Sequence, residues 1–103
     1  MHEALSSRLD AIRAICERHA VRTLDVFGSA ARGVDFDPDR SDVDLIVCFA
    51  RDDAADPLEQ FFGLRDALAA SLGRPVDLVE EGAIRNPFIQ ASIQRSRRPI
   101  YGA

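Results

Sequence analysis

Residues 42–49 read Asp-Val-Asp-Leu-Ile-Val-Cys-Phe and form the clearest strand pattern in the 103-residue chain. Val43, Leu45, Val47 and Phe49 alternate with the other four residues, so their side chains point to one face of a strand. The second half of this stretch is apolar on both faces, which is typical of a strand that helices cover on both sides. Its first half instead carries two carboxylates on one face.

Helical and β-prone segments alternate on either side of this strand. Apolar spacing, proline-led starts and glycine ends mark the helices, and short runs of branched apolar residues mark the strands. We predict helices over 3–19, 29–33, 57–72 and 87–96, and further strands over 21–27, 76–79 and 99–101. This order predicts an α/β fold with a small mixed β-sheet flanked by helices, built as a single domain over residues 1–103.

Apolar residues recur within the predicted helix over 57–72. Its buried side is predicted to comprise Leu58, Phe61, Phe62, Leu68 and Leu72. Phe61, Phe62 and Phe88 occur at helical spacings, and we interpret them as core or partner-helix contacts rather than as platforms for base stacking.

The charge balance excludes some partners. The net charge is −4, the pI is about 5.0, and all 13 basic residues are Arg. A dedicated binder of nucleic acid or of an anionic membrane would carry a basic face, so neither partner is predicted. The longest apolar run, residues 45–50, is too short to span a bilayer, and the first residues lack the pattern of a signal peptide. Two cysteines within apolar patterns suit a reducing compartment, which predicts a cytoplasmic protein.

Five aspartates fall within ten residues, at positions 35, 37, 39, 42 and 44. A calcium-binding loop that starts at Asp35 is excluded, because its sixth position holds Arg40 instead of Gly and its twelfth holds Ile46 instead of Glu. The first three acids are interpreted as solvated loop residues.

Asp42 and Asp44 are better placed for chemistry. Two residues apart on a strand, they lie on one face with Cα atoms about 7 Å apart. Paired carboxylates at that spacing can hold hard divalent cations, typically Mg²⁺, and leave coordination sites for substrate phosphates.

Gly28-Ser29 lies between a predicted strand and a predicted helix. A small pair in that position presents backbone N–H groups and a hydroxyl to an anion. It is neither a dinucleotide-binding fingerprint nor a P-loop, because the further glycines and the lysine are missing. On its own Gly-Ser is a weak motif. It gains weight here because it is followed by a helix, a loop and then Asp42-Val43-Asp44 on the next strand.

The combination of hydrophobic strand, Gly-Ser, short loop and Asp-x-Asp resembles the nucleotidyltransferase superfamily of DNA polymerase β. Residues 28–33 (Gly-Ser-Ala-Ala-Arg-Gly) and 41–45 (Ser-Asp-Val-Asp-Leu) resemble the minimal nucleotidyltransferase (MNT) family of prokaryotes, which includes the MntA-like antitoxins of HEPN/MNT toxin–antitoxin pairs. Residues 74–79 (Arg-Pro-Val-Asp-Leu-Val) resemble the strand that carries the third carboxylate of the family. Residues 86–101 resemble its closing helix and terminal aromatic residue.

The resemblance implies roles for three acids. Asp42 and Asp44 would bind two Mg²⁺ ions that orient ATP and stabilise charge on the α-phosphate and on departing pyrophosphate. Asp77 would complete the metal site and help to deprotonate the acceptor hydroxyl. Without the family, Asp77 reads equally well as an exposed acid at a strand end.

The resemblance also implies that Gly28 and Ser29 hold the nucleotide triphosphate. For Arg32 two roles stay open, pairing with a phosphate or with an acid such as Asp25. The basic residues Arg95, Arg97 and Arg98 are interpreted as the solvated end of a helix, with a phosphate or nucleic-acid contact as the alternative.

The implied activity is Mg²⁺-dependent transfer of AMP from ATP to a hydroxyl, that of a Tyr in a HEPN toxin, by an antitoxin that forms a hetero-oligomer with its target. The alternative is a non-catalytic antitoxin that neutralises its partner by complex formation. A small-molecule acceptor such as an aminoglycoside is disfavoured, because family members of that kind carry an extra helical domain.

Overall fold

The computed structural model describes residues 1–33, 42–50 and 54–102. A mixed sheet of four strands in the order β3-β2-β1-β4 lies at its centre. The strands are β1 (Val21–Phe27), β2 (Val43–Phe49), β3 (Val76–Glu80) and β4 (Arg98–Tyr101). β1 runs antiparallel to both β2 and β4, whereas β2 and β3 are parallel. The α/β fold with a small mixed sheet is therefore confirmed, and the four predicted strands are present.

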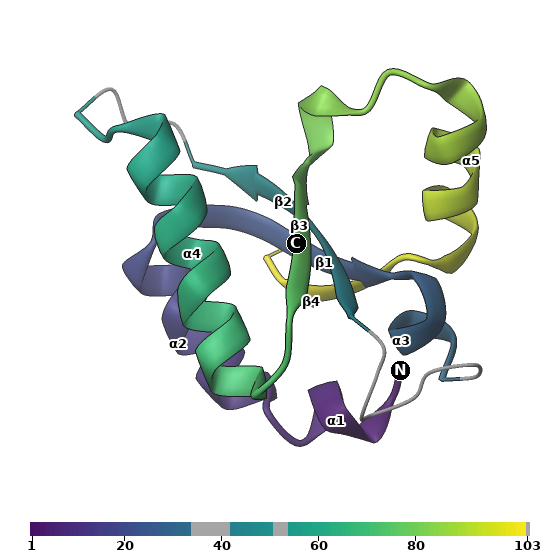
Figure 1. Ribbon diagram of the computed structural model, residues 1–103, viewed down its shortest axis with the longest axis horizontal. Helices are drawn as coiled ribbons and strands as arrows, with labels where there is room; N and C mark the ends of the chain where they lie inside the picture. The colour runs from purple at the N-terminus through teal and green to yellow at the C-terminus, as the bar shows by residue number, and fades with distance from the viewer. Residues whose placement is uncertain (34–41, 51–53, 103) are drawn as a thin grey trace.

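Helices cover the two faces of this sheet unequally (Figure 1). Two long helices, α2 (Leu9–Arg18) and α4 (Pro57–Leu72), pack side by side on one face, and α5 (Pro87–Ser96) lies across the other. The short elements are α1 (Glu3–Ser6), α3 (Gly28–Arg32) directly after β1, and the 3₁₀ turn η1 (Glu81–Ala83) directly after β3. No helix among the described residues is long and apolar enough to cross a membrane.

The main hydrophobic core lies between the sheet and the pair α2 and α4. Alternate residues of the strands point into it, and the buried set includes Leu24, Val26, Val43, Leu45, Val47 and Leu78. The helices contribute Ile12, Ile15, Leu64 and Leu68. Because strand side chains alternate, residues 44, 46 and 48 of β2 must point to the α5 face. Core burial on one face thus fixes which side chains β2 offers on the other.

Local signals set both ends of α4 and the start of α5. The Asp56 carboxylate accepts hydrogen bonds from the N–H groups of Leu58 and Glu59, and proline occupies the first turn of α4. Asn86 caps α5 in the same way. Gly73 ends α4 in the left-handed region at a φ of 66°. These caps confirm the starts of both helices and the end of α4.

The predicted single helix over 3–19 is wrong, because it is broken after Ser6. Arg8 adopts φ −118° and ψ 11°, outside the helical region, and α2 restarts at Leu9. Two consecutive serines at the break favour a turn over a helix interior. The break allows the N-terminus to reach α3, where the His2 N–H donates a hydrogen bond of 2.7 Å to the Ala30 carbonyl.

The predicted buried side of α4 is partly wrong. Leu58 is 69% exposed and Phe62 44% exposed. The Phe62 ring instead lies edge-on to Phe61 and beneath the Arg65 guanidinium, 4.7 Å from the ring centroid. The buried face follows a spacing of four residues through Leu64, Leu68 and Leu72.

The predicted loop acids Asp35, Asp37 and Asp39 lie outside the described residues.

Burial separates the chemistry of the two thiols. Cys16 is fully buried in the core, and this burial raises its pKa to about 11. At pH 9 only about 1% of such a thiol is thiolate, the reactive form. We therefore expect Cys48→Ser, which leaves only Cys16, to resist iodoacetamide in its folded state and to react fully in urea. Cys16→Ala, which leaves the partly exposed Cys48, serves as the comparison. Equal labelling of the two folded variants, measured by mass spectrometry, would contradict this assignment.

Candidate active site

The sheet register brings two of the predicted acids together. Asp44 of β2 pairs directly with Asp77 of β3, and the two strands are parallel. Directly paired residues on adjacent strands share a face, and the strands lie about 4.8 Å apart. Both carboxylates therefore belong to the α5 face of the sheet. Asp42 precedes β2 by one residue and is exposed, two positions from Asp44.

Gly28 meets this acidic pair from the other side. Its neighbour Phe27 pairs with Asp44 across β1 and β2, which places the end of β1 beside the carboxylate. Gly28 adopts a φ of +71°, and a Cβ atom there would lie 2.6 Å from the Asp44 Oδ2 atom. A side chain at this position would therefore both strain the backbone and displace the carboxylate. This is the physical reason for glycine at the first position of the motif.

The negative charges of the acids at this site repel one another. The pKa of Asp44 is raised, first by burial of its carboxylate and then by the negative charges of Asp77 and Asp42, while Arg32 acts in the opposite sense. Carboxylate oxygens are the ligands that hard divalent cations prefer. A cation among these acids would relieve the repulsion, so the donor set fits Mg²⁺. Within residues 1–33, 42–50 and 54–102, no group of three or more His, Cys, Asp and Glu side chains is arranged so that it could hold a metal ion.

The short helix α3 carries the other predicted nucleotide-binding residues. Ser29 is half-buried in its first turn and Arg32 is exposed at its end. Gly33 follows in the left-handed region, which confirms the predicted end of this helix. The Gly28 N–H donates a hydrogen bond of 3.0 Å to the Ser96 hydroxyl of α5.

Arg97 contradicts the interpretation of a solvated helix end. Its side chain is only 18% exposed, and it donates hydrogen bonds of 2.7 Å to both Asp25 and Glu81. Burial disfavours its charge, but the hydrogen bonds that Arg97 donates to these two carboxylates, together with their negative charges, outweigh burial and raise its pKa. Arg97 is thus the residue that pairs with Asp25, the acid considered as a partner for Arg32. Arg95 and Arg98 are exposed, as predicted.

A cavity of about 390 Å³ opens between the acidic site and α5. Asp44 and Gly28 form one side of it, and Phe88, Ile89 and Ser92 form part of the other. Phe88 is 83% exposed, so it is not a core residue of this chain, and the other alternative, a contact with a partner helix, stays a prediction. The cavity is large enough for part of a small-molecule substrate, and it opens onto the carboxylate that the register places beside Asp77.

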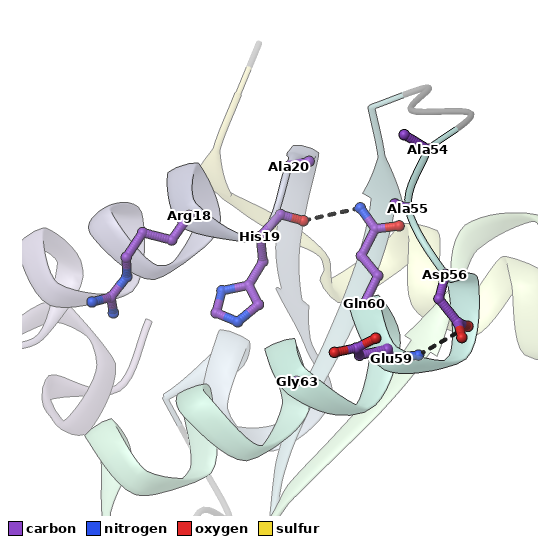
Figure 2. A pocket seen from close by; sticks show the side chains of 9 residues that line it. All are labelled: Arg18, His19, Ala20, Ala54, Ala55, Asp56, Glu59, Gln60 and Gly63. Carbon is purple, nitrogen blue, oxygen red and sulfur yellow. Dashed lines mark hydrogen bonds between the residues drawn. The ribbon is translucent and has the colours of Figure 1, made fainter.

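A second cavity, of about 440 Å³, lies away from these acids, where the end of α2 meets the start of α4 (Figure 2). The Gln60 side-chain amide donates a hydrogen bond of 3.0 Å to the His19 carbonyl across it. Asp56 lines it but is engaged in capping α4. None of the predicted site residues lines this second cavity. The candidate active site is therefore the one on the α5 face of the sheet.

Comparison with known proteins agrees with this geometry. The sequence profile of the nucleotidyltransferase domain matches residues 9–100. The chain belongs to the nucleotidyltransferase family. A protein of Methanocaldococcus jannaschii named "putative protein adenylyltransferase" is 42% identical to this nucleotidyltransferase over 78 residues, which are 76% of this chain and 74% of that protein.

Solved structures share its fold. One described as a "putative minimal nucleotidyltransferase" is 34% identical, with a TM-score of 0.75 and 96% of each chain covered. A complex of a tri-AMPylated Shewanella oneidensis HEPN toxin with an MNT antitoxin contains a chain 19% identical to this one. Its TM-score is 0.65, and 95% of this chain and 72% of that chain are covered. The resemblance to minimal nucleotidyltransferases is thereby confirmed.

Sequence reasoning missed Ser96 and Arg97 as residues of this site. Ser96 ends the predicted helix over 87–96 and Arg97 follows it, and they meet α3 and β1 only in three dimensions. Ser96 is buried together with Ile93, one turn earlier, and no local spacing in the sequence reveals that its hydroxyl reaches Gly28.

Gly28→Ala tests the close approach to Asp44. The left-handed backbone should cost about 1–2 kcal/mol of unfolding free energy, measured in urea. Gly73→Ala is the matched control, since Gly73 has a similar φ of +66° but no atom within 4 Å of a Cβ. Both variants should lose similar stability, but only Gly28→Ala should lose nucleotidyl transfer. Wild-type turnover by Gly28→Ala would contradict the steric argument.

Asp44→Asn tests the electrostatic argument in metal-free buffer. Because the pKa of Asp44 is raised in the fold, its contribution to stability is lost as pH rises through that pKa. The neutral amide should therefore melt at a higher temperature than the wild type at pH 7. This difference should disappear at a pH below 3.8, the ordinary value for the carboxyl. Asp66→Asn, at a 70%-exposed acid of α4, is the control. A lower melting temperature for Asp44→Asn at pH 7 would contradict the prediction.

Proposed function

We propose that this nucleotidyltransferase transfers AMP from ATP to the hydroxyl of a Tyr in a HEPN toxin, and that it acts in this way as an antitoxin. The observation that carries the proposal is the direct pairing of Asp44 with Asp77 beside Gly28. The named relatives support the choice of chemistry, since one bears the name of a protein adenylyltransferase and another was solved with an AMPylated HEPN toxin.

Asp42, Asp44 and Asp77 are the residues proposed to hold Mg²⁺. When bound, the metal would offset negative charge on the triphosphate and on the departing pyrophosphate. The pKa of Asp44 is raised first by burial and then by the negative charges of Asp77 and Asp42. A bound cation would relieve that repulsion, which supports the proposed role.

Ser29 and Arg32 are proposed to contact the triphosphate. Ser29 offers a hydroxyl and a backbone N–H in the first turn of α3, and both groups can donate to phosphate oxygens. Arg32 lies on the same helix, and its positive charge already acts on Asp44. Since Arg97 occupies Asp25, the structure favours phosphate over Asp25 as the partner for Arg32.

Asp77 is proposed to accept the proton of the acceptor. It is exposed, so a hydroxyl from another protein can reach it without any opening of the fold. The hydroxyl oxygen attacks the α-phosphorus and forms the new P–O bond. The bond to the β-phosphate breaks, pyrophosphate leaves with its electron pair, and the hydroxyl proton passes to the Asp77 carboxylate.

The test is to incubate the chain with a purified HEPN toxin, ATP and Mg²⁺, and to weigh the toxin by intact mass spectrometry. We expect one or more AMP units on the toxin. Asp44→Asn and Asp77→Asn should slow labelling by at least about 100-fold, whereas Asp66→Asn should label at the wild-type rate. A tight complex that stays unmodified would support the non-catalytic antitoxin instead. Labelling that persists in Asp44→Asn would overturn the mechanism.

A further inference from the structure

Ser96, in the last turn of α5, lies against Gly28 although 68 residues separate them. Its hydroxyl accepts a hydrogen bond of 3.0 Å from the Gly28 N–H and lies 3.5 Å from the Ser92 carbonyl, to which it donates. Ser96 is only 6% exposed and is the buried polar side chain among the described residues. A buried hydroxyl with a defined acceptor and donor role is held in one orientation.

This hydrogen bond decides what Gly28 can do. Its N–H already has a partner, so it is not a free donor for a phosphate oxygen. What Gly28 offers is space, because a Cβ would stand 2.6 Å from Asp44 Oδ2. Glycine also has access to more backbone conformations than any other residue, so its place beside Asp44 needs an external restraint.

The residues before and after Ser96 in the chain hold it in place. The next residue, Arg97, is bonded to Asp25 of β1 and to Glu81 just beyond β3, each at 2.7 Å. Ile93, one turn earlier, is buried at 4% exposure. The end of α5 is therefore tied to β1 and to the 3₁₀ turn that follows β3, and it presents the Ser96 hydroxyl to Gly28 from a fixed position.

We propose that Ser96 is a positioning residue for nucleotidyl transfer. Its hydroxyl fixes the Gly28 peptide, Gly28 in turn packs its bare Cα against Asp44, and Asp44 is held in line with Asp77. Phosphate binding falls to Ser29 and the backbone of α3, so the Ser96 hydroxyl affects turnover rather than affinity for the nucleotide. This inference rests on the proposed function for its kinetic part.

The kinetic test compares Ser96→Ala, Ser96→Cys and Ser96→Thr with the wild type at saturating HEPN toxin. Alanine has no acceptor and the cysteine thiol is a weak one, so both should lower kcat by roughly 10-fold or more and leave the KM for ATP within about 2-fold. Threonine keeps the hydroxyl and should restore kcat. Ser71→Ala is the matched control, since Ser71 also lies in the last turn of a helix, α4, which covers the opposite face of the sheet from α5. Wild-type kcat in Ser96→Ala, or a loss confined to KM, would overturn the proposal.

A second readout needs no activity. Exchange of the Gly28 amide proton, followed by NMR in metal-free protein, should be at least about 10-fold faster in Ser96→Ala than in the wild type and slow again in Ser96→Thr. If the wild type transfers no AMP, the proposed function fails, and the Gly28 exchange rates then decide the positioning role by themselves. Equal exchange in Ser96→Ala and the wild type would overturn it.

Discussion

The carboxylates of Asp44 and Asp77 are held side by side by backbone hydrogen bonding between β2 and β3, against their own repulsion. A change of register by one residue would turn Asp44 toward the core and bring Val43 or Leu45 to the α5 face. That change is prevented by the other face of β2, where Val43, Leu45 and Val47 are fully or almost fully buried. The hydrophobic core thus supplies the stability that an unfavourable pair of like charges requires.

The two faces of the sheet therefore have different roles. The face under α2 and α4 contains the main core, while the α5 face carries acids, hydroxyls and a cavity. α5 itself contributes little to the core, since Ile93 and Ser96 are its buried residues. Its attachment depends instead on polar contacts, through Arg97 to Asp25 and Glu81 and through Ser96 to Gly28. A helix attached in this way can be held in a defined position beside the candidate site even though it contributes little to the stability of the core.

Sequence reasoning succeeded where the signal is local. The alternation in β2, the caps Asp56 and Asn86, and the spacing of Asp42 and Asp44 all act over a few residues, and the structure bears out the elements predicted from them. It failed where a tertiary contact decides. Helical spacing alone did not separate the exposed Phe62 from the buried Leu64, because the packing of α2 against α4 sets which face is covered.

The same limit applies to the candidate site. The acids could be chosen from the sequence, but the partners of Gly28 and Asp25 could not, because Ser96 and Arg97 reach them from about 70 residues away in the chain. Composition alone predicts that the arginines at positions 95, 97 and 98 form a solvated helix end. Arg97 departs from that pattern because the sheet places two carboxylates, Asp25 and Glu81, within reach of one guanidinium, whose fork of donors can serve both.

The distribution of charge also determines how an anionic substrate could enter. The chain carries a net charge of −4, and the negative charges of Asp42 and Asp77 both act on Asp44. The partly buried Arg97 is already neutralised by Asp25 and Glu81. Arg32 is the basic group whose positive charge counteracts the other acids at Asp44. One guanidinium cannot balance a triphosphate among three carboxylates. Under the proposed function, a triphosphate at this site would therefore bind together with cations, and Asp42, Asp44 and Asp77 are the groups proposed to hold them.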